Sequence, residues 1–205
     1  MKDGLLIAFE GIDGTGKSTQ LQLLAAFLQD MGCRVISTRE PTDSSYGRRI
    51  RELYMDRGSC SLEEELDLFI QDRRLHVQEL INPQLAGGSL VLTDRYYFST
   101  AAYQGAAGMD VAEIFASNSF APIPDLVIML TMDPEVSIAR IREGRGEELN
   151  DFEQLDQLKK VASHFASFSD PCIHRIDAAA NLHQVQKQVQ YAVSTLLEER
   201  KFTCP

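Results

Sequence analysis

The chain has 205 residues, of which 44% are hydrophobic and 24% are charged, and its formal net charge is -10. This acidic balance argues against broad nucleic-acid binding, which needs a basic surface. It is compatible with a small anionic ligand, because a few arginines in one cleft can outweigh the global field. The length suits one domain, so we expect residues 1–205 to form a single unit.

The N-terminal segment and the cysteines bear on the compartment. The apolar run at 5–9 is too short to span a membrane, and no signal peptide is visible. The four cysteines lie far apart and none forms a CxxC pair: Cys33, Cys60, Cys172 and Cys204. We therefore expect reduced thiols, with no disulfide framework and no cysteine metal site. Together these features predict a cytoplasmic protein with no membrane partner.

Short apolar runs alternate with longer helical patterns. The predicted strands lie at 5–9, 33–38, 89–94, 125–131 and 172–177. They are apolar on both faces, as strands are in a parallel sheet covered by helices. The predicted helices lie at 17–31 (ended by Gly32), 62–81 (ended by Asn82-Pro83), 135–143 and 181–199. This alternation predicts a three-layer α/β fold with a five-stranded parallel sheet flanked by helices.

A phosphate-binding loop, GIDGTGKS, lies between the first predicted strand and the first predicted helix, the P-loop context. Backbone N–H groups and the helix N-terminus face an anion in such a loop. The Lys17 ammonium adds positive charge, and the Ser18 hydroxyl can ligate Mg²⁺. We predict nucleotide phosphate binding by Gly11, Asp13, Gly14, Thr15, Gly16, Lys17, Ser18 and Thr19.

Asp13 is unexpected in this loop, because a carboxylate repels phosphate. We expect its side chain to point away from the phosphates and to accept a hydrogen bond from a hydroxyl, for example on a sugar.

Two motifs end the next predicted strands, where ligands bind in open α/β sheets. The first, TREP, contains Arg39, and the second, DRYYFSTAAYQG, begins with Asp94 and Arg95. Asp94 is placed to help hold Mg²⁺, and the two guanidinium groups suit a phosphate. A helix cap for Asp94 and surface ion pairs for the arginines are the alternative roles.

Phe69 and Arg73 share a face of the helix predicted at 62–81, because they are four residues apart. A ring followed one turn later by a guanidinium could stack on a planar base and bond to its edge. Core packing of Phe69 and simple exposure of Arg73 are the alternatives.

The segment 142–153, REGRGEELNDFE, is highly charged and lacks an apolar stripe. It is either a solvated turn between helices or a mobile lid over a phosphate site, and its position alone does not separate these interpretations.

The motifs FEGIDGTGKSTQ, TREP, LDLFIQDRRLH, DRYYFSTAAYQG and PDLVIMLTMDPE occur in an order and spacing that resembles bacterial thymidylate kinases. The resemblance covers most of the chain. It implies transfer of the γ-phosphoryl group of ATP to dTMP, with Mg²⁺, by a homodimer. A kinase for another deoxynucleoside monophosphate and a non-catalytic nucleotide-binding paralogue remain as alternatives.

The resemblance also implies roles for individual residues. Asp13 would bind the sugar 3′-hydroxyl, Arg39 and Arg95 the monophosphate, Phe69 and Arg73 the face and edge of thymine, Thr100 and Gln104 the base, and Tyr103 the region of the sugar 2′ carbon. Catalytic charge would come from Lys17, Arg95 and the lid arginines Arg142 and Arg145, with Arg140 as an additional candidate, because the loop has Gly14 where some members have arginine. Ser18 and Asp94 would hold the metal. The lid departs from the family pattern at 150–153, where an arginine is missing.

Overall fold

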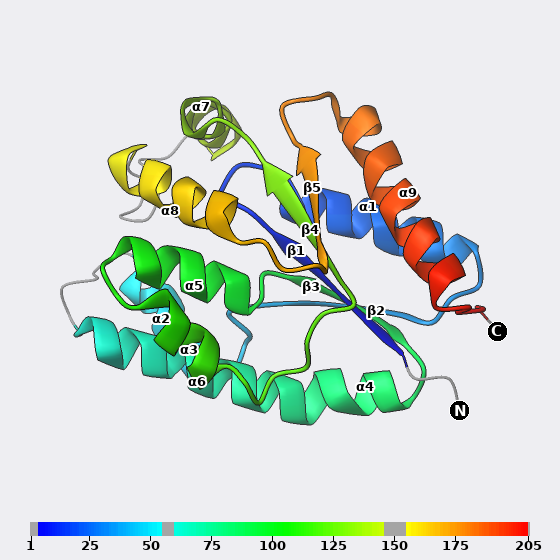
Figure 1. Cartoon of the computed structure of the whole chain (residues 1–205), viewed down its shortest axis with the longest axis horizontal. Helices are drawn as coiled ribbons and strands as arrows, with labels where there is room; N and C mark the ends of the chain where they lie inside the picture. The colour runs from blue at the N-terminus through cyan, green and yellow to red at the C-terminus, as the bar shows by residue number, and fades with distance from the viewer. Residues whose placement is uncertain (1–3, 55–59, 146–154, 205) are drawn as a thin grey trace.

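A computed structural model describes residues 4–54, 60–145 and 155–204. The predicted lid residues 146–153 lie outside these ranges. Within the described residues, the strands form one parallel sheet in the order β2-β3-β1-β4-β5 (Figure 1). The strands are β1 (Leu5–Glu10), β2 (Val35–Arg39), β3 (Leu90–Asp94), β4 (Leu126–Thr131) and β5 (Ile173–Asp177). The predicted five-stranded parallel sheet is confirmed.

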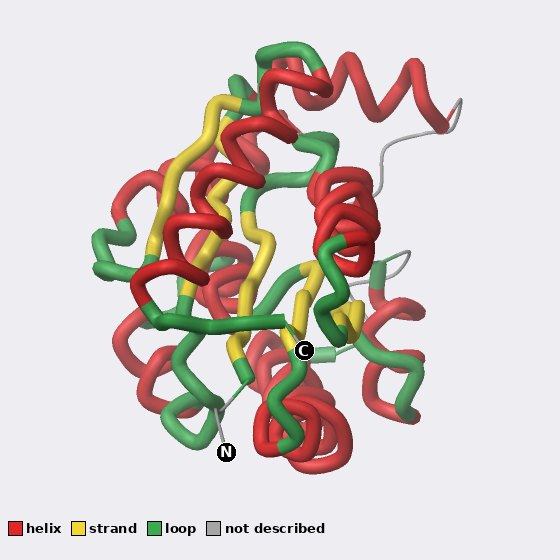
Figure 2. The backbone as a smooth tube through the Cα atoms, turned by 90° about the vertical axis from the view of Figure 1, so that its right-hand side faces the viewer, coloured by secondary structure: helices red, strands yellow, loops and turns green. Residues whose placement is uncertain are grey.

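The helices form two layers, one on each face of the sheet (Figures 1 and 2). One layer consists of α1 (Lys17–Asp30) and α9 (Leu182–Glu199). The other contains α3 (Leu62–His76), a π-helical turn η2 (Val77–Ile81), α4 (Asn82–Ala86), α5 (Tyr97–Ala106), α6 (Val111–Ser117) and α8 (Leu155–Ser167). Two further helices, α2 (Ser45–Leu53) and α7 (Pro134–Arg145), follow β2 and β4.

Strand β1 divides its side chains between two cores. Leu6 and Ala8 join the cluster beneath α5 and α8, whereas Ile7 and Phe9 join the cluster beneath α1 and α9. This alternation follows from the two-residue period of a strand. Burial on both faces, expected for all five strands, holds for β1, β3 and β4 but not for β2 and β5, which are partly exposed because they form the edges of the sheet.

The ends of two helices can be compared with the ends that local sequence signals predicted. Gly32 ends α1 as predicted, with a left-handed φ of 85°. The expected stop at Asn82-Pro83 is wrong, because the helical path continues through η2 into α4. Pro83 is the second residue of α4 and directly follows the π-helical turn, so the helical path passes through the proline rather than ending before it.

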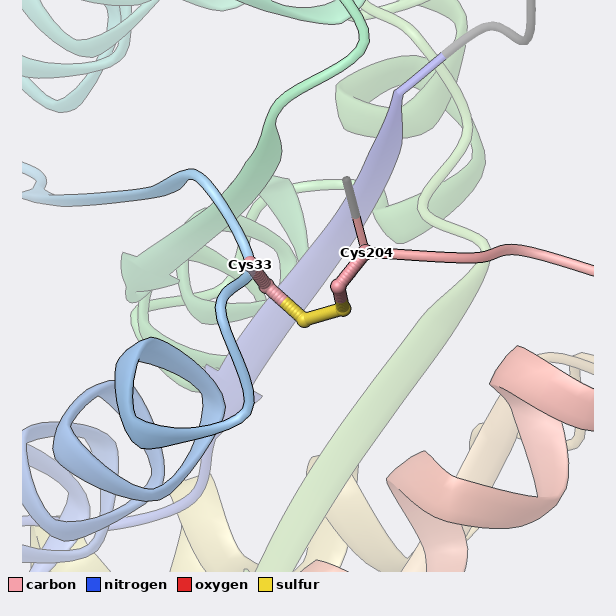
Figure 3. The surroundings of a disulfide bond; sticks show 2 residues. All are labelled: Cys33 and Cys204. Carbon is pink, nitrogen blue, oxygen red and sulfur yellow. A yellow bond between two sulfur atoms is a disulfide. The ribbon is translucent and has the colours of Figure 1, made fainter.

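A disulfide joins Cys33, just before β2, to Cys204 in the C-terminal segment, with Cα atoms 4.4 Å apart (Figure 3). This overturns the expectation that all four cysteines are reduced thiols. The two cysteines meet because the chain folds back after α9: the Phe202 N–H donates to the Leu197 carbonyl at 2.8 Å, and Phe202 packs on the α1–α9 core. Spacing in the sequence gives no sign of this return.

Among the described helices, none is both long and apolar enough to cross a bilayer.

Candidate active site

The phosphate loop connects β1 to α1 and is held against α7. A Cβ on Gly11 would lie 2.3 Å from the Leu130 carbonyl oxygen, and one on Gly14 would lie 2.7 Å from the Ser137 carbonyl oxygen. Both glycines also have left-handed φ values, 133° and 78°. The Ser137 hydroxyl donates to the Asp13 carbonyl, so α7 anchors the loop directly.

Lys17 begins α1 and is buried. Its ammonium and the Thr15 hydroxyl both donate to the Ile12 carbonyl, each at 2.9 Å. Burial, together with the charge of Arg95, lowers the pKa of Lys17 to about 8. The ammonium therefore remains charged at neutral pH and lies within the loop that would hold phosphates. Thr19, two residues further along the helix, is exposed.

Ser18 and Asp94 form the candidate metal site. The Ser18 hydroxyl donates to Asp94 Oδ2, while Asp94 Oδ1 is buried without a hydrogen-bond partner among the described residues. A carboxylate oxygen in need of a partner beside a hydroxyl fits Mg²⁺, which proteins bind through one or two side chains plus substrate phosphates. The described residues contain no cluster of three or more His, Cys, Asp or Glu side chains that could hold a metal.

Asp13, Arg95 and Tyr103 converge between the phosphate loop and α5. Arg95 Nη2 donates to Asp13 Oδ1 at 2.6 Å, and the Tyr103 hydroxyl donates to Asp13 Oδ2 at 2.8 Å. The Arg95 guanidinium also lies 5.1 Å from the centre of the Tyr103 ring. The structure thus brings together three residues predicted to contact the acceptor.

The charges in this cluster support one another. Burial alone would raise the pKa of Asp13, but the charges of Arg95 and Lys17 and the Tyr103 hydroxyl lower it to about 2. Asp13 is therefore ionised and can accept a hydrogen bond from a further hydroxyl, as expected for a sugar contact. Burial and the neighbouring Asp13 charge raise the pKa of Tyr103, so its hydroxyl remains a donor.

Arg95 is fixed by two residues that the sequence analysis missed. Its Nη1 donates to the Ser99 hydroxyl at 2.8 Å, and Ser99 in turn donates to the carboxylate of Glu10. Glu10 also accepts the backbone N–H groups of Tyr96 and Ser99, at 2.9 and 3.1 Å. These contacts hold Arg95 at a φ of 72°, a left-handed conformation that side chains with a Cβ rarely adopt.

Arg73 lies deeper than predicted, with 1% of the residue exposed. Its Nε and Nη2 donate to Glu40 Oε2 at 2.9 and 2.5 Å, and Nη2 also donates to the Thr100 hydroxyl at 3.0 Å. Its Nη1 donates to Asn118 Oδ1 at 2.5 Å. The alternative of a simply exposed arginine is therefore excluded.

Glu40 and His76 extend this buried network, and neither was selected from the sequence. His76 Nδ1 is 2.9 Å from Glu40 Oε1, and its Nε2 is 2.7 Å from the Thr38 hydroxyl. Burial alone would raise the pKa of Glu40, but Arg73 and His76 lower it. The only signal that could have found Glu40 is its place in TREP, beside the predicted Arg39.

Three further predicted residues differ in their surroundings. Phe69 is half-buried on α3. Gln104 is completely buried, and neither of its amide atoms has a partner among the described residues, which is unusual unless a ligand or water supplies one. Arg39 does not join the Arg95 cluster: its side chain is 64% exposed and pairs with Asp43 at 3.0 Å. Arg39 instead lines a cavity of about 770 Å³ whose wall also includes Ser18 and Asp94.

The lid arginines are only partly described. Residues 142–145 are helical and form the end of α7, where a turn or lid was expected. Arg142 is exposed there, and the side chain of Arg145 lies outside the described part. Arg140, an additional candidate, is committed elsewhere, because its Nη1 donates to the Ala178 carbonyl at 2.9 Å.

Comparisons with known proteins assign this site to a family. The sequence model of the thymidylate kinase family matches residues 9–189. A thymidylate kinase of Desulfotalea psychrophila is 51% identical over 195 residues, which are 95% of this chain and 96% of the relative. Thymidylate kinases of Xanthomonas campestris pv. campestris and Xanthomonas oryzae pv. oryzae are 44% and 42% identical, each over 96% of this chain and 86% of the relative. The chain belongs to the thymidylate kinase family and is a nucleoside monophosphate kinase.

Proposed function

We propose that the chain transfers the γ-phosphoryl group of ATP to dTMP, giving dTDP and ADP. The observation that carries this proposal is the contact between the two halves of the site. Asp13, a residue of the phosphate loop, is bonded to both Arg95 and Tyr103, so donor and acceptor would meet across one side chain. Such proximity is the main requirement of phosphoryl transfer.

The chain's own residues supply alignment and positive charge. Lys17 would neutralise the β- and γ-phosphates of ATP, while Arg95 would hold the acceptor monophosphate, with Arg39 turned in from solvent. The acceptor phosphate is already an anionic nucleophile, so no strong general base is needed. Asp13 would accept a hydrogen bond from the sugar 3′-hydroxyl. Tyr103 would pack against the 2′ carbon and disfavour a ribonucleotide.

The base would be recognised by side chains from α3 and α5. Half-buried Phe69 would stack on thymine, and Arg73 and Gln104 would bond to its polar edge. Thr100 would contribute by accepting a hydrogen bond from the Arg73 guanidinium. The unpartnered amide of Gln104 favours a polar ligand at this position.

Ser18 and Asp94 would hold Mg²⁺ together with the nucleotide phosphates. When bound, the ion would neutralise charge on the transferring group. Residues 142–153 would act as a lid that brings Arg142 and Arg145 over the phosphates, within a single kinase domain spanning 1–205. We further propose that the enzyme is a homodimer and works in the cytoplasm. Light scattering at micromolar concentration would test the dimer.

A coupled assay of ADP release tests the function against a panel of nucleoside monophosphates. We expect robust turnover with dTMP. Turnover only with another acceptor would replace this proposal with a different monophosphate kinase. ATP binding without turnover on any acceptor would indicate a non-catalytic nucleotide-binding protein.

A further inference from the structure

The guanidinium of Arg73 is enclosed on three sides by buried protein groups. Glu40, from the loop after β2, accepts two of its N–H groups, and Thr100 on α5 accepts a third. Asn118, the residue that follows α6, accepts a fourth on Nη1. A guanidinium has five N–H groups, so these four bonds leave one N–H, and it is also on Nη1.

Asn118 is itself held in one orientation. It is 3% exposed, and its Nδ2 donates to the Ile114 carbonyl of α6 at 2.8 Å. Because the amide nitrogen faces this carbonyl, the amide oxygen must face Arg73. The Asn118 side chain thus connects α6 to Arg73 Nη1 and fixes the one relative to the other.

We propose that Asn118 is a positioning residue for the acceptor base, acting through Arg73; this inference rests on the proposed function. The two N–H groups of Nη1 lie in the guanidinium plane at a fixed angle, so a partner that fixes one also fixes the other. Glu40 sets the position of the guanidinium through Nε and Nη2, and Asn118 sets the direction of the remaining donor.

The chemistry of the remaining group predicts what it selects. An N–H donor needs an acceptor on the base edge, and thymine offers its O4 oxygen. Uracil has the same oxygen, whereas cytosine presents an amino group, which is itself a donor. Asn118 should therefore contribute to the preference for dTMP over dCMP, and not to the preference for dTMP over dUMP, which differs only by a methyl group.

Three variants test this inference. Asn118→Ala removes the acceptor for Arg73, whereas Asn118→Asp keeps an oxygen acceptor there, loses the donor to Ile114 and adds a negative charge next to the guanidinium. Ser119→Ala changes an exposed neighbour and serves as the control. For Asn118→Ala we expect the KM for dTMP to rise about ten-fold, consistent with loss of one hydrogen bond to a charged group. The kcat and the KM for ATP should stay within about two-fold, and Asn118→Asp should recover most of the loss.

The outcomes separate positioning from a merely structural role. A KM for dTMP that is unchanged in Asn118→Ala would overturn the inference. So would equal increases in the KM values for dTMP and ATP, or an Asn118→Asp variant as impaired as Asn118→Ala. The ratio of kcat/KM for dTMP over dCMP should fall in Asn118→Ala while the ratio over dUMP stays constant. Absence of turnover in the unmodified enzyme would instead reject the proposed function.

Discussion

Glu10 is buried at the end of β1, beneath the cluster that contains Arg95. Burial, only partly offset by the hydrogen bond from Ser99 and the charge of Arg95, raises its pKa from 4.5 to about 7. The folded protein therefore binds this proton more tightly than the unfolded chain does. The resulting stabilisation is complete below the unfolded pKa and is lost as pH rises through the folded pKa. The shift corresponds to about 3 kcal/mol at most.

Glu10→Gln should remove this pH dependence, because an amide does not titrate. We expect the free energy of unfolding of the unmodified protein to fall between about pH 5 and about pH 8 by up to about 3 kcal/mol more than that of the variant. Urea unfolding at the two pH values measures the difference. Glu198→Gln, at an exposed position on α9, should behave like the unmodified protein. Parallel pH profiles for Glu10→Gln and the unmodified protein would contradict the prediction.

Asp94 offers a second test at a single side chain. Asp94→Asn keeps the shape but removes the charge beside Ser18, so the protein should need roughly ten-fold more Mg²⁺ for half-maximal activity. Titration of activity with Mg²⁺ after removal of metal by a chelator measures this. Asp30→Asn, an exposed change at the end of α1, is the control. An unchanged Mg²⁺ requirement in Asp94→Asn would exclude Asp94 from the metal site.

The sequence predicted the residues that contact the acceptor better than the residues that hold those contacts in place. Asp13, Arg95 and Tyr103 could be selected because each belongs to a motif with a chemical meaning, and the structure brings them together. Asn118 could not be selected, because it acts through a contact between residues 45 positions apart in the chain. Such a support depends on tertiary packing and leaves no local pattern.

At the scale of the helices, α7 presents two neighbouring arginines in different situations. Arg140 is tied by its guanidinium to the carbonyls of Ala178 and Ala179, at 2.9 and 3.5 Å. Arg142 is exposed near the end of the helix, where the chain enters the proposed lid. The same helix holds the phosphate loop through Ser137, so a lid attached to it would move relative to a fixed base.

Arg142→Ala should lower kcat by at least about ten-fold while the KM values for ATP and dTMP change little, because charge on the transferring group matters most in the transition state. Arg140→Ala is the matched control on the same helix. It should lower the melting temperature through loss of its carbonyl contacts and leave kcat within about two-fold. If Arg140→Ala lowers kcat and Arg142→Ala does not, the two roles are reversed and the assignment of Arg142 fails.

The helices also show why element prediction was incomplete. The helix α5 was treated only as a motif because nine of its ten residues are buried. A helix buried on all sides has no polar face and therefore no 3.6-residue alternation to detect. The continuation through η2 and α4 was missed because Asn82-Pro83 predicts a helix end, whereas the helical path continues past both residues.

At the scale of the whole molecule, the parallel sheet and its two cores determine where the site lies. The phosphate loop follows β1, Asp94 ends β3 and Arg39 ends β2, so three neighbouring strands deliver their residues to one edge of the sheet. This arrangement, like the family itself, was predictable because the short apolar runs alternate clearly with helical patterns and the motifs are specific. The path of the chain after α9 was not, because it depends on the packing of Phe202.

The disulfide between Cys33 and Cys204 ties the C-terminal segment to the start of β2, across a sequence separation of 171 residues (Figure 3). A crosslink of this kind stabilises the fold mainly by restricting the unfolded chain, typically by roughly 2–4 kcal/mol. Reduction should release the segment without disturbing the site, because both cysteines belong to the α1–α9 core, on the opposite face of the sheet from α5.

Cys204→Ser should therefore lower the melting temperature of the oxidised protein by several degrees, roughly 5 °C, and should abolish the further decrease that a reducing agent causes in the unmodified protein. Cys172→Ser is the control, because Cys172 is a free thiol and its loss leaves the disulfide intact. That variant should keep its sensitivity to reductant. Thermal unfolding with and without reductant measures both effects, and peptide mapping without reduction identifies the bond. A reductant effect that persists in Cys204→Ser would show that the stabilising crosslink lies elsewhere, and kcat should stay within about two-fold throughout, because the crosslink stabilises the fold without shaping the site.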